Sequence, residues 1–237
     1  MSAAAVAESK LNRSLRFYQT TIGKKIIVAV TGIILFGFVA GHMLGNLQVF
    51  MGQEAMNAYG ALLHAEPAIL WVVRLVLLAA VGLHILMSVQ LALASREARP
   101  VGYQKWTSVK SSYASRTMIW SGPIIGAFLV YHLLQFTVGV TGLDKFRTTE
   151  LHGHTIPLPY DNVVAGFQNP IVCVAYIIAM ALLMFHLQHG IWSMFQTLGV
   201  NRPGLLPKLK AFAVAFSLLL FLGFSSIPVA VLLGIVR

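Results

Sequence analysis

Cysteine is scarce in this chain. A single cysteine, Cys173, among 237 residues excludes an internal disulfide and any cluster of thiolate ligands drawn from this chain alone. The sequence contains neither a C-x-x-C-H motif for covalent haem attachment nor a G-x-G-x-x-G fingerprint for dinucleotides. Iron–sulfur clusters held by this chain, c-type haem and Rossmann-type flavin binding are therefore excluded.

Charge is also rare, and long apolar runs take its place. Charged residues make up 10% of the chain and hydrophobic residues 57%, with a mean hydropathy of +0.78, which is outside the range of soluble globular proteins. A helix needs roughly 20 apolar residues to cross hydrocarbon about 30 Å thick. Five stretches reach that length, at about residues 26–49, 68–94, 117–141, 169–197 and 211–235. We predict an all-α integral membrane protein, a five-helix bundle that forms a single domain over residues 1–237.

The distribution of basic residues predicts how this bundle is oriented. Lysines and arginines gather before residue 26, between residues 96 and 116, and between residues 202 and 210. Because the five spans alternate in direction, all three segments lie on one side, and the positive-inside rule makes that side the cytoplasm of a bacterial inner membrane. The polar stretch 142–167 is then an outer loop. The net charge of +10 follows from this topology and does not indicate nucleic-acid binding.

Four histidines stand alone in four different apolar spans. A helix rises about 25 Å between Lys25 and His42, and His132 reaches the same depth along the third span. Counted from the outer ends of their own spans, His84 and His186 lie about 25 Å inward, near the cytoplasmic face. The sequence thus predicts two pairs at two depths, His42 with His132 towards the outer face and His84 with His186 towards the inner face.

Two imidazoles at one depth on facing helices can hold the iron of a b-type haem without covalent attachment. Two such pairs predict two haems b. No carboxylate or thiolate lies at these depths, although zinc and non-haem iron sites usually recruit them. Glycines accompany the histidines, at Gly37, Gly41, Gly45, Gly82, Gly126 and Gly190. They indicate either room for a flat macrocycle or close helix packing, and the sequence does not decide between the two.

The other four histidines are weaker candidates. His64 precedes the second span, and His152 and His154 lie in the predicted outer loop, where surface roles are usual. His189 follows His186 by three residues, so both rings point to similar sides of one helix. Depth alone does not select between these two.

Several local sequences resemble one family. They are GHMLGN around His42, GLH at His84, SYASRTMIWSG leading to YH at His132, and FHLQHGIWSMFQTLG around His186. Through these blocks nearly the whole chain resembles the diheme cytochrome b membrane-anchor subunit of succinate dehydrogenase and fumarate reductase. In that family the ligand of the fourth span precedes a glycine by four residues, so the resemblance selects His186 over His189. It implies the same pairing as the depths do.

The resemblance also implies partners. A flavoprotein subunit and an iron–sulfur subunit would dock on the cytoplasmic side, and this chain would relay electrons between the iron–sulfur subunit and membrane quinone. We expect menaquinone, with ubiquinone as the alternative. The chain alone is not expected to act on succinate. The resemblance leaves open the physiological direction and any higher oligomer of the complex.

Polar residues at both ends of the spans are candidates for quinone binding. They are His64, Glu66, Asn46 and Gln48 at the outer end, and Ser115, Arg116, Trp106 and Tyr103 at the inner end. Such residues would supply hydrogen bonds and protons. Helix capping and interface anchoring are the alternative roles. We favour the outer end, where diheme members of the family often handle quinone.

Arg74 lies inside the second span, about 15 Å from His84 along the helix. An unpaired arginine in the membrane is costly, so we predict an anionic partner. The propionates of the outer haem are the predicted partner, and snorkelling of the side chain to the outer interface is the alternative.

Two other functions are compatible with the composition. A haem-free transporter or scaffold would use the histidines in a proton relay, but no acidic residue lies at matching depths. A diheme cytochrome b subunit of another quinone-linked respiratory enzyme would share the haems and differ in its catalytic partners.

Overall fold

Five long helices dominate the structure, a computed structural model that describes residues 16–99, 101, 111–200 and 202–237. Their bounds are Thr21–Asn46 (α2), Pro67–Glu97 (α4), Tyr113–Leu133 (α5), Pro170–Thr197 (α7) and Leu206–Leu232 (α8). A 3-10 turn, η1 (Leu47–Met51), extends α2, and a π-helical turn, η2 (Leu134–Val138), extends α5. All five are long and apolar enough to cross a membrane. The prediction of an all-α membrane bundle is confirmed.

Polar residues and prolines mark where several of these helices begin. The side chains of Thr20, Ser112 and Asn169 accept hydrogen bonds from main-chain N–H groups in the first turns of α2, α5 and α7, at 2.9, 3.1 and 2.9 Å. These N–H groups have no partner within the helix, so such caps stabilise its start. Pro67 and Pro170 occupy the first turns of α4 and α7, where a missing N–H costs nothing.

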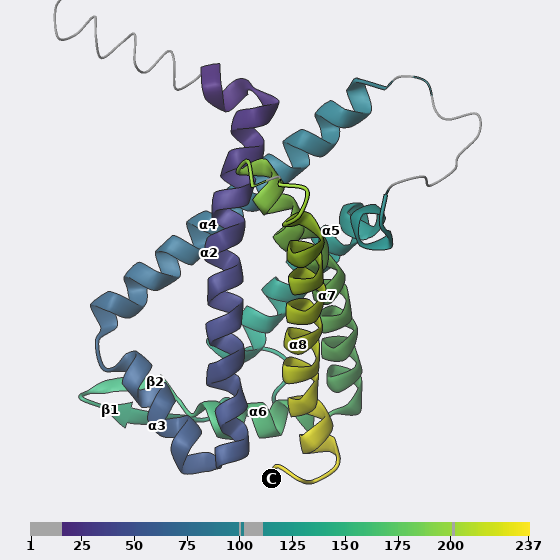
Figure 1. Ribbon diagram of the computed structural model, residues 1–237. Helices are drawn as coiled ribbons and strands as arrows, with labels where there is room; N and C mark the ends of the chain where they lie inside the picture. Colours follow the sequence, from purple (N-terminus) through teal and green to yellow (C-terminus); the bar gives the residue numbers. More distant parts are fainter. Residues whose placement is uncertain (1–15, 100, 102–110, 201) are drawn as a thin grey trace, which may run out of the picture.

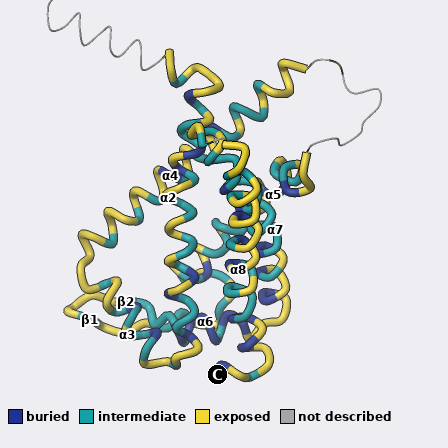
Figure 2. The backbone as a smooth tube through the Cα atoms, viewed as in Figure 1, coloured by how far each residue is buried: buried dark blue, intermediate teal, exposed yellow. Residues whose placement is uncertain are grey.

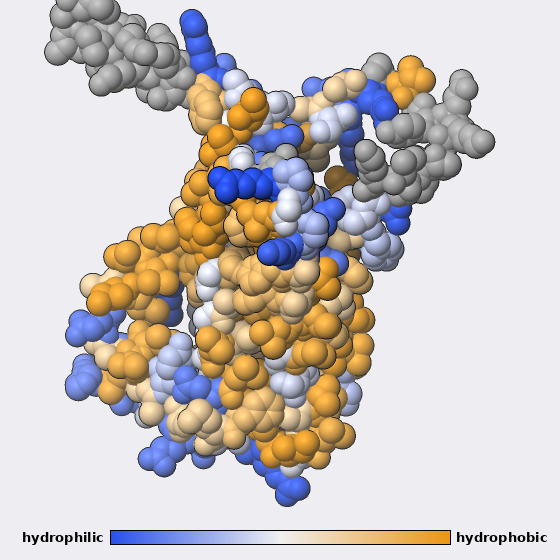
Figure 3. Space-filling view, in the orientation of Figure 1, coloured by the Kyte–Doolittle hydropathy of each residue, from blue (hydrophilic) through white to orange (hydrophobic). Residues whose placement is uncertain are grey.

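The long helices pack unevenly. α7 lies along α8 and α5 and also contacts α2, whereas α4 packs mainly against α2 and crosses it obliquely (Figure 1). Exposed positions run along the outer faces of the helices (Figure 2). On the face seen in Figure 3, hydrophobic residues cover the middle of the molecule and hydrophilic residues gather at its two ends. This distribution is the one expected for a surface in contact with lipid.

Four short elements close one end of the bundle. They are α3 (Gln53–His64), the hairpin of β1 (Thr148–Leu151) and β2 (His154–Pro157), and α6 (Pro159–Phe167). We call this the cap end, and we call the opposite end, where α2 begins and α4 ends, the basic end. The prediction of a loop over residues 142–167 misses the hairpin and α6.

The hairpin has a specific physical cause. Leu151 pairs with His154, so the turn consists of His152 and Gly153 alone. Both have positive φ angles, 50° and 78°, as the tight two-residue turns that match the twist of a hairpin require. The strands are only four residues long, which is too short for an alternating pattern to stand out in the sequence.

Asn162 attaches this hairpin region to α6. Its side chain accepts a hydrogen bond from the Arg147 N–H at 2.8 Å and donates one to the Arg147 carbonyl at 2.9 Å. The side chain is 2% exposed, so both of its polar atoms find partners in a place without water. One buried amide thus anchors the segment that leads into β1.

The third span ends earlier than the predicted residue 141. The helix stops at Val138 because Gly139 adopts a left-handed conformation, with a φ of 76°. The N–H groups of Gly139 and Val140 both donate to the Leu134 carbonyl at 3.0 Å, which closes the helix. Cys173, on α7, is fully buried.

Candidate cofactor site

Two of the four predicted histidines meet near the cap end. His42 comes from α2 and His132 from α5, and their ring centres are 5.8 Å apart with an interplanar angle of 85°. Phe38 stacks on His42 at 5.3 Å, and Phe128 and Phe136 lie 6.0 and 5.7 Å from His132. We call His42 and His132 the cap-end pair.

The other two predicted histidines meet nearer the basic end. His84 of α4 and His186 of α7 have ring centres 6.3 Å apart, with an interplanar angle of 52°. We call them the basic-end pair. Depth alone does not separate His186 from His189, and the structure places the ring of His186 next to His84. The helices therefore bring together the two pairs that the depths indicate.

The spacing within each pair suits a metal ion between the rings. Two imidazoles that bind one metal from opposite sides have ring centres about 6 Å apart, because the metal–nitrogen distance is about 2 Å. Among the described residues, no group of three or more His, Cys, Asp or Glu side chains gathers. Paired imidazoles without thiolates or carboxylates fit the axial ligands of haem b better than they fit zinc.

The glycines near the histidines leave room beside the helices. A Cβ added at Gly37, Gly41, Gly82, Gly126 or Gly190 would meet nothing within 4 Å. Close helix packing predicts contacts at those points, so it does not explain these five glycines, whereas a macrocycle wedged between helices would use the space. Gly45 differs, because a Cβ there would lie 2.7 Å from the Tyr59 ring.

Hydrogen bonds orient three of the four imidazoles. The Nδ1 atoms of His84 and His132 lie 3.1 Å from the Thr31 hydroxyl and 3.2 Å from the Tyr176 hydroxyl. The Asn46 amide nitrogen lies 3.3 Å from Nε2 of His42, so a metal at that nitrogen would displace this contact.

The fourth imidazole lacks such a partner. Nδ1 of His186 is buried without a hydrogen-bond partner among the described residues. Leaving a ring nitrogen buried and unpaired costs free energy. No hydrogen bond at Nδ1 orients this ring, so a bound group would orient it instead.

A comparison with known protein families identifies the family to which this bundle belongs. The family model of the succinate dehydrogenase/fumarate reductase transmembrane subunit matches residues 95–224, more than half of the chain. The chain belongs to this family. No curated protein and no solved structure matches it. The matched segment of this succinate dehydrogenase/fumarate reductase subunit contains α5 and α7, with His132 and His186, while His42 and His84 precede it.

The polar candidates at the cap end lie at the end of α2, in η1 and at the turn between α3 and α4. His64 ends α3, and its Nδ1 lies 2.8 Å from the Gly60 carbonyl. Glu66 directly precedes α4 and is exposed. Asn46, at the end of α2, faces His42 as described above, and Gln48 lies in η1. The structure thus gathers these residues at the cap end.

The inner candidates are only partly described. The Ser115 N–H donates to the Ser112 hydroxyl in the cap of α5, and Arg116 follows in the same turn. Tyr103 and Trp106 lie outside the described residues.

The guanidinium of Arg74 lies 5.2 Å from the ring centre of Trp71, a cation–π contact that the sequence analysis did not foresee. Its pairing with a haem propionate stays a prediction.

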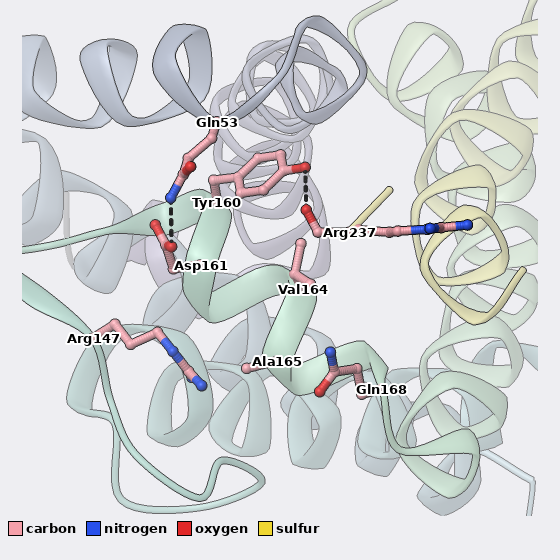
Figure 4. Close-up of a pocket in the computed structure, with 8 residues that line it drawn as sticks. All are labelled: Gln53, Arg147, Tyr160, Asp161, Val164, Ala165, Gln168 and Arg237. Atoms are coloured by element: carbon pink, nitrogen blue, oxygen red, sulfur yellow. Dashed lines mark hydrogen bonds between the residues drawn. The ribbon is translucent and has the colours of Figure 1, made fainter. Parts of the chain in front are cut away.

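A further polar site at the cap end was missed by the sequence analysis. A cavity of about 160 Å³ lies where α3, α6 and the last residue of the chain meet (Figure 4). Gln53 donates to Asp161 at 2.7 Å, and the Tyr160 hydroxyl donates to a main-chain oxygen of Arg237 at 2.8 Å. Its residues come from separate segments of the sequence, so no local motif reveals it. These bonds connect α3, α6 and the end of the chain.

Proposed function

We propose that the chain is the diheme cytochrome b anchor of a succinate dehydrogenase or fumarate reductase complex, relaying electrons between the iron–sulfur subunit and membrane quinone. The observation that supports this most directly is the presence of two imidazole pairs at two depths of a bundle that belongs to this family. In this proposal residues 1–237 form one functional domain.

Each pair would hold one haem b. His42 and His132 would hold the haem at the cap end, and His84 and His186 would hold the haem at the basic end. When bound, each haem would accept and donate a single electron at its iron. The open flanks at the neighbouring glycines would leave space for the macrocycle, and Arg74 would offer a positive charge to a propionate.

The proposed orientation places the basic end in the cytoplasm of a bacterium. The described basic residues of three segments lie at that end, as the positive-inside rule requires: Arg16, Lys24, Lys25, Arg96, Arg99, Arg116, Arg202, Lys208 and Lys210. A flavoprotein and an iron–sulfur subunit would dock there and supply the succinate chemistry for which this chain has no motif. The basic-end pair would then be nearer to the iron–sulfur subunit.

We place the quinone at the cap end, with menaquinone as the expected type and ubiquinone as the alternative. Glu66 and His64 flank the turn between α3 and α4, and each would exchange protons with a bound quinone, which needs two protons for full reduction. Ser115 and Arg116, at the start of α5, are the corresponding candidates at the basic end. Substitution of Glu66 by Gln, compared with Arg116→Gln, distinguishes the two ends by its effect on quinone reduction.

The first experiment is a reduced-minus-oxidised optical spectrum of the purified complex, with quantitation of haem as the pyridine haemochrome. We expect about two haems b per chain, reducible by succinate. Haem that is reduced only by another donor would assign the chain to a different quinone-linked enzyme. A complex without haem would contradict the proposal and leave a membrane scaffold or transporter.

A further inference from the structure

His132 stands at the end of a chain of hydrogen bonds that crosses from α5 to α7 and back. Its Nδ1 lies 3.2 Å from the Tyr176 hydroxyl oxygen. The Tyr176 hydroxyl donates to Oε1 of Gln135 at 2.8 Å, and Nε2 of Gln135 donates to the Gly142 carbonyl at 3.2 Å. Three side chains and one main-chain carbonyl thus form a continuous series.

The last member of the series, the Gly142 carbonyl, sets the direction of every hydrogen bond in it. A carbonyl oxygen only accepts, so the Gly142 carbonyl requires the amide nitrogen of Gln135. The amide oxygen of Gln135 then faces Tyr176 and takes the single hydroxyl hydrogen. The Tyr176 oxygen must therefore accept from His132, which carries its proton on Nδ1. Nε2 of His132 is left with a free lone pair, the state that a metal requires.

The surroundings keep this series in place. Gln135 is 0% exposed, and a Cβ added at Gly142 or Gly166 would come within 2.7 or 3.0 Å of its amide nitrogen. Tyr176 is buried as well, and its ring packs edge to face on Phe167, with ring centres 4.9 Å apart. Because both groups are buried, their polar atoms depend on partners within the protein.

The π-helical turn η2 contains the glutamine. It begins two residues after His132 and forms the last turn of the span. The π turn therefore sets where the Gln135 amide lies, and Gly142 and Gly166 leave room beside it.

We propose that Tyr176 and Gln135 are positioning residues that fix the tautomer and orientation of His132 and thereby set the redox potential of the cap-end haem. The inference rests on the proposed function. A ligating imidazole that donates its second N–H becomes more basic and is held in one orientation. A more basic ligand stabilises ferric iron more than ferrous iron, so this series lowers the potential of that haem.

The test is a redox titration of the intact complex, followed by optical and electron paramagnetic resonance spectra. Tyr176→Phe removes the acceptor for Nδ1–H, and loss of such an outer partner typically weakens the metal site 10- to 100-fold. A tenfold preferential weakening of the ferric state corresponds to a rise of 59 mV. We expect a rise of this order at the cap-end haem and an unchanged basic-end haem. Loss of the cap-end haem alone would equally support the proposal.

The matched control is Tyr131→Phe. The Tyr131 ring lies 6.2 Å from that of Tyr176, yet its hydroxyl is not a member of the series, so we expect no change in potential. Equal shifts in the two variants, or no shift in Tyr176→Phe, would overturn the inference.

A second variant covers the case in which Tyr176→Phe does not assemble. Gln135→Met keeps a similar volume and leaves the Tyr176 hydroxyl without its acceptor, so the hydroxyl can turn towards His132. We expect a smaller rise at the cap-end haem, and an unchanged potential would overturn the inference. Wild-type complex that lacks this haem would instead contradict the proposed function, so the two failures are distinguishable.

Discussion

The two histidine pairs differ in how the protein itself holds them. At the cap end, the series through Tyr176 and Gln135 orients His132 from behind. At the basic end, Thr31 orients His84, and the ring of His186 has a buried Nδ1 without a described partner. His132 is thus held by a longer series than His84 is, and the basic-end pair would depend more on a group bound between its rings.

The helices do not share this difference. α5, which contributes His132, packs mainly against α7, and α4, which contributes His84, packs mainly against α2. A haem at the cap end would link α2 to α5, and a haem at the basic end would link α4 to α7. We infer that each haem would join two helices that otherwise make few contacts with each other.

The largest expected effect comes from removing one ligand of each pair in turn. His132→Ala should eliminate the cap-end haem and His84→Ala the basic-end haem, since an iron that loses an axial nitrogen is not retained in that form. The pyridine haemochrome should fall from about two haems per chain to about one. Each variant should keep the haem of the other pair. Loss of both haems in either variant would contradict two separate sites.

A second experiment tests which histidine of α7 completes the basic-end pair. His186→Ala should remove the basic-end haem, whereas His189→Ala should retain it, because the ring of His186 is the one beside His84. The two residues are one helical turn apart, so each variant serves as the control for the other. Haem loss in His189→Ala, with full retention in His186→Ala, would show that the assignment is wrong.

The sequence predicted the long helices and the pairing of the histidines well, because both follow from simple periodicities. Span length follows from membrane thickness, and the depth of a residue such as His84 follows from the rise of a helix. The surroundings of the rings were not predictable in this way. Tyr176 and Gln135 are far apart in the sequence, and only the packing of α5 against α7 brings them together.

The same limit explains what was missed at the cap end. The four-residue strands and the cavity near Asp161 have no pattern in the sequence long enough to distinguish them from a loop. The choice between room for a cofactor and close helix packing at Gly41 also needed coordinates, since a glycine permits both. Local sequence therefore predicted which histidines come close to one another, and tertiary contacts supplied the hydrogen-bonding groups beside them.

A larger side chain at Gly190 tests whether the space beside the basic-end pair holds a macrocycle. Gly190 lies one turn after His186, and a Cβ there meets nothing within 4 Å. Gly190→Leu should compete with the macrocycle for this space at a cost of about 1–3 kcal/mol, so the basic-end haem should bind roughly tenfold more weakly or worse. The control is Ala175→Leu, at an exposed position of the same helix. Equal haem retention in both would contradict a macrocycle at Gly190.

The smallest expected effect concerns the hydrogen bond between Thr31 and His84. The Thr31 hydroxyl donates to the Ile27 carbonyl at 2.7 Å, so it accepts from Nδ1–H of His84 and leaves Nε2 free for a metal. Thr31→Val keeps the shape and removes this acceptor, which should cost about 1 kcal/mol and speed the transfer of the basic-end haem to an external haem acceptor about fivefold. Thr31→Ser restores the hydroxyl and should restore the wild-type rate. A wild-type rate for Thr31→Val, with a faster rate for Thr31→Ser, would show that the methyl packing of Thr31, and not its hydroxyl, positions His84. The cap-end pair alone would then be oriented by hydrogen bonds.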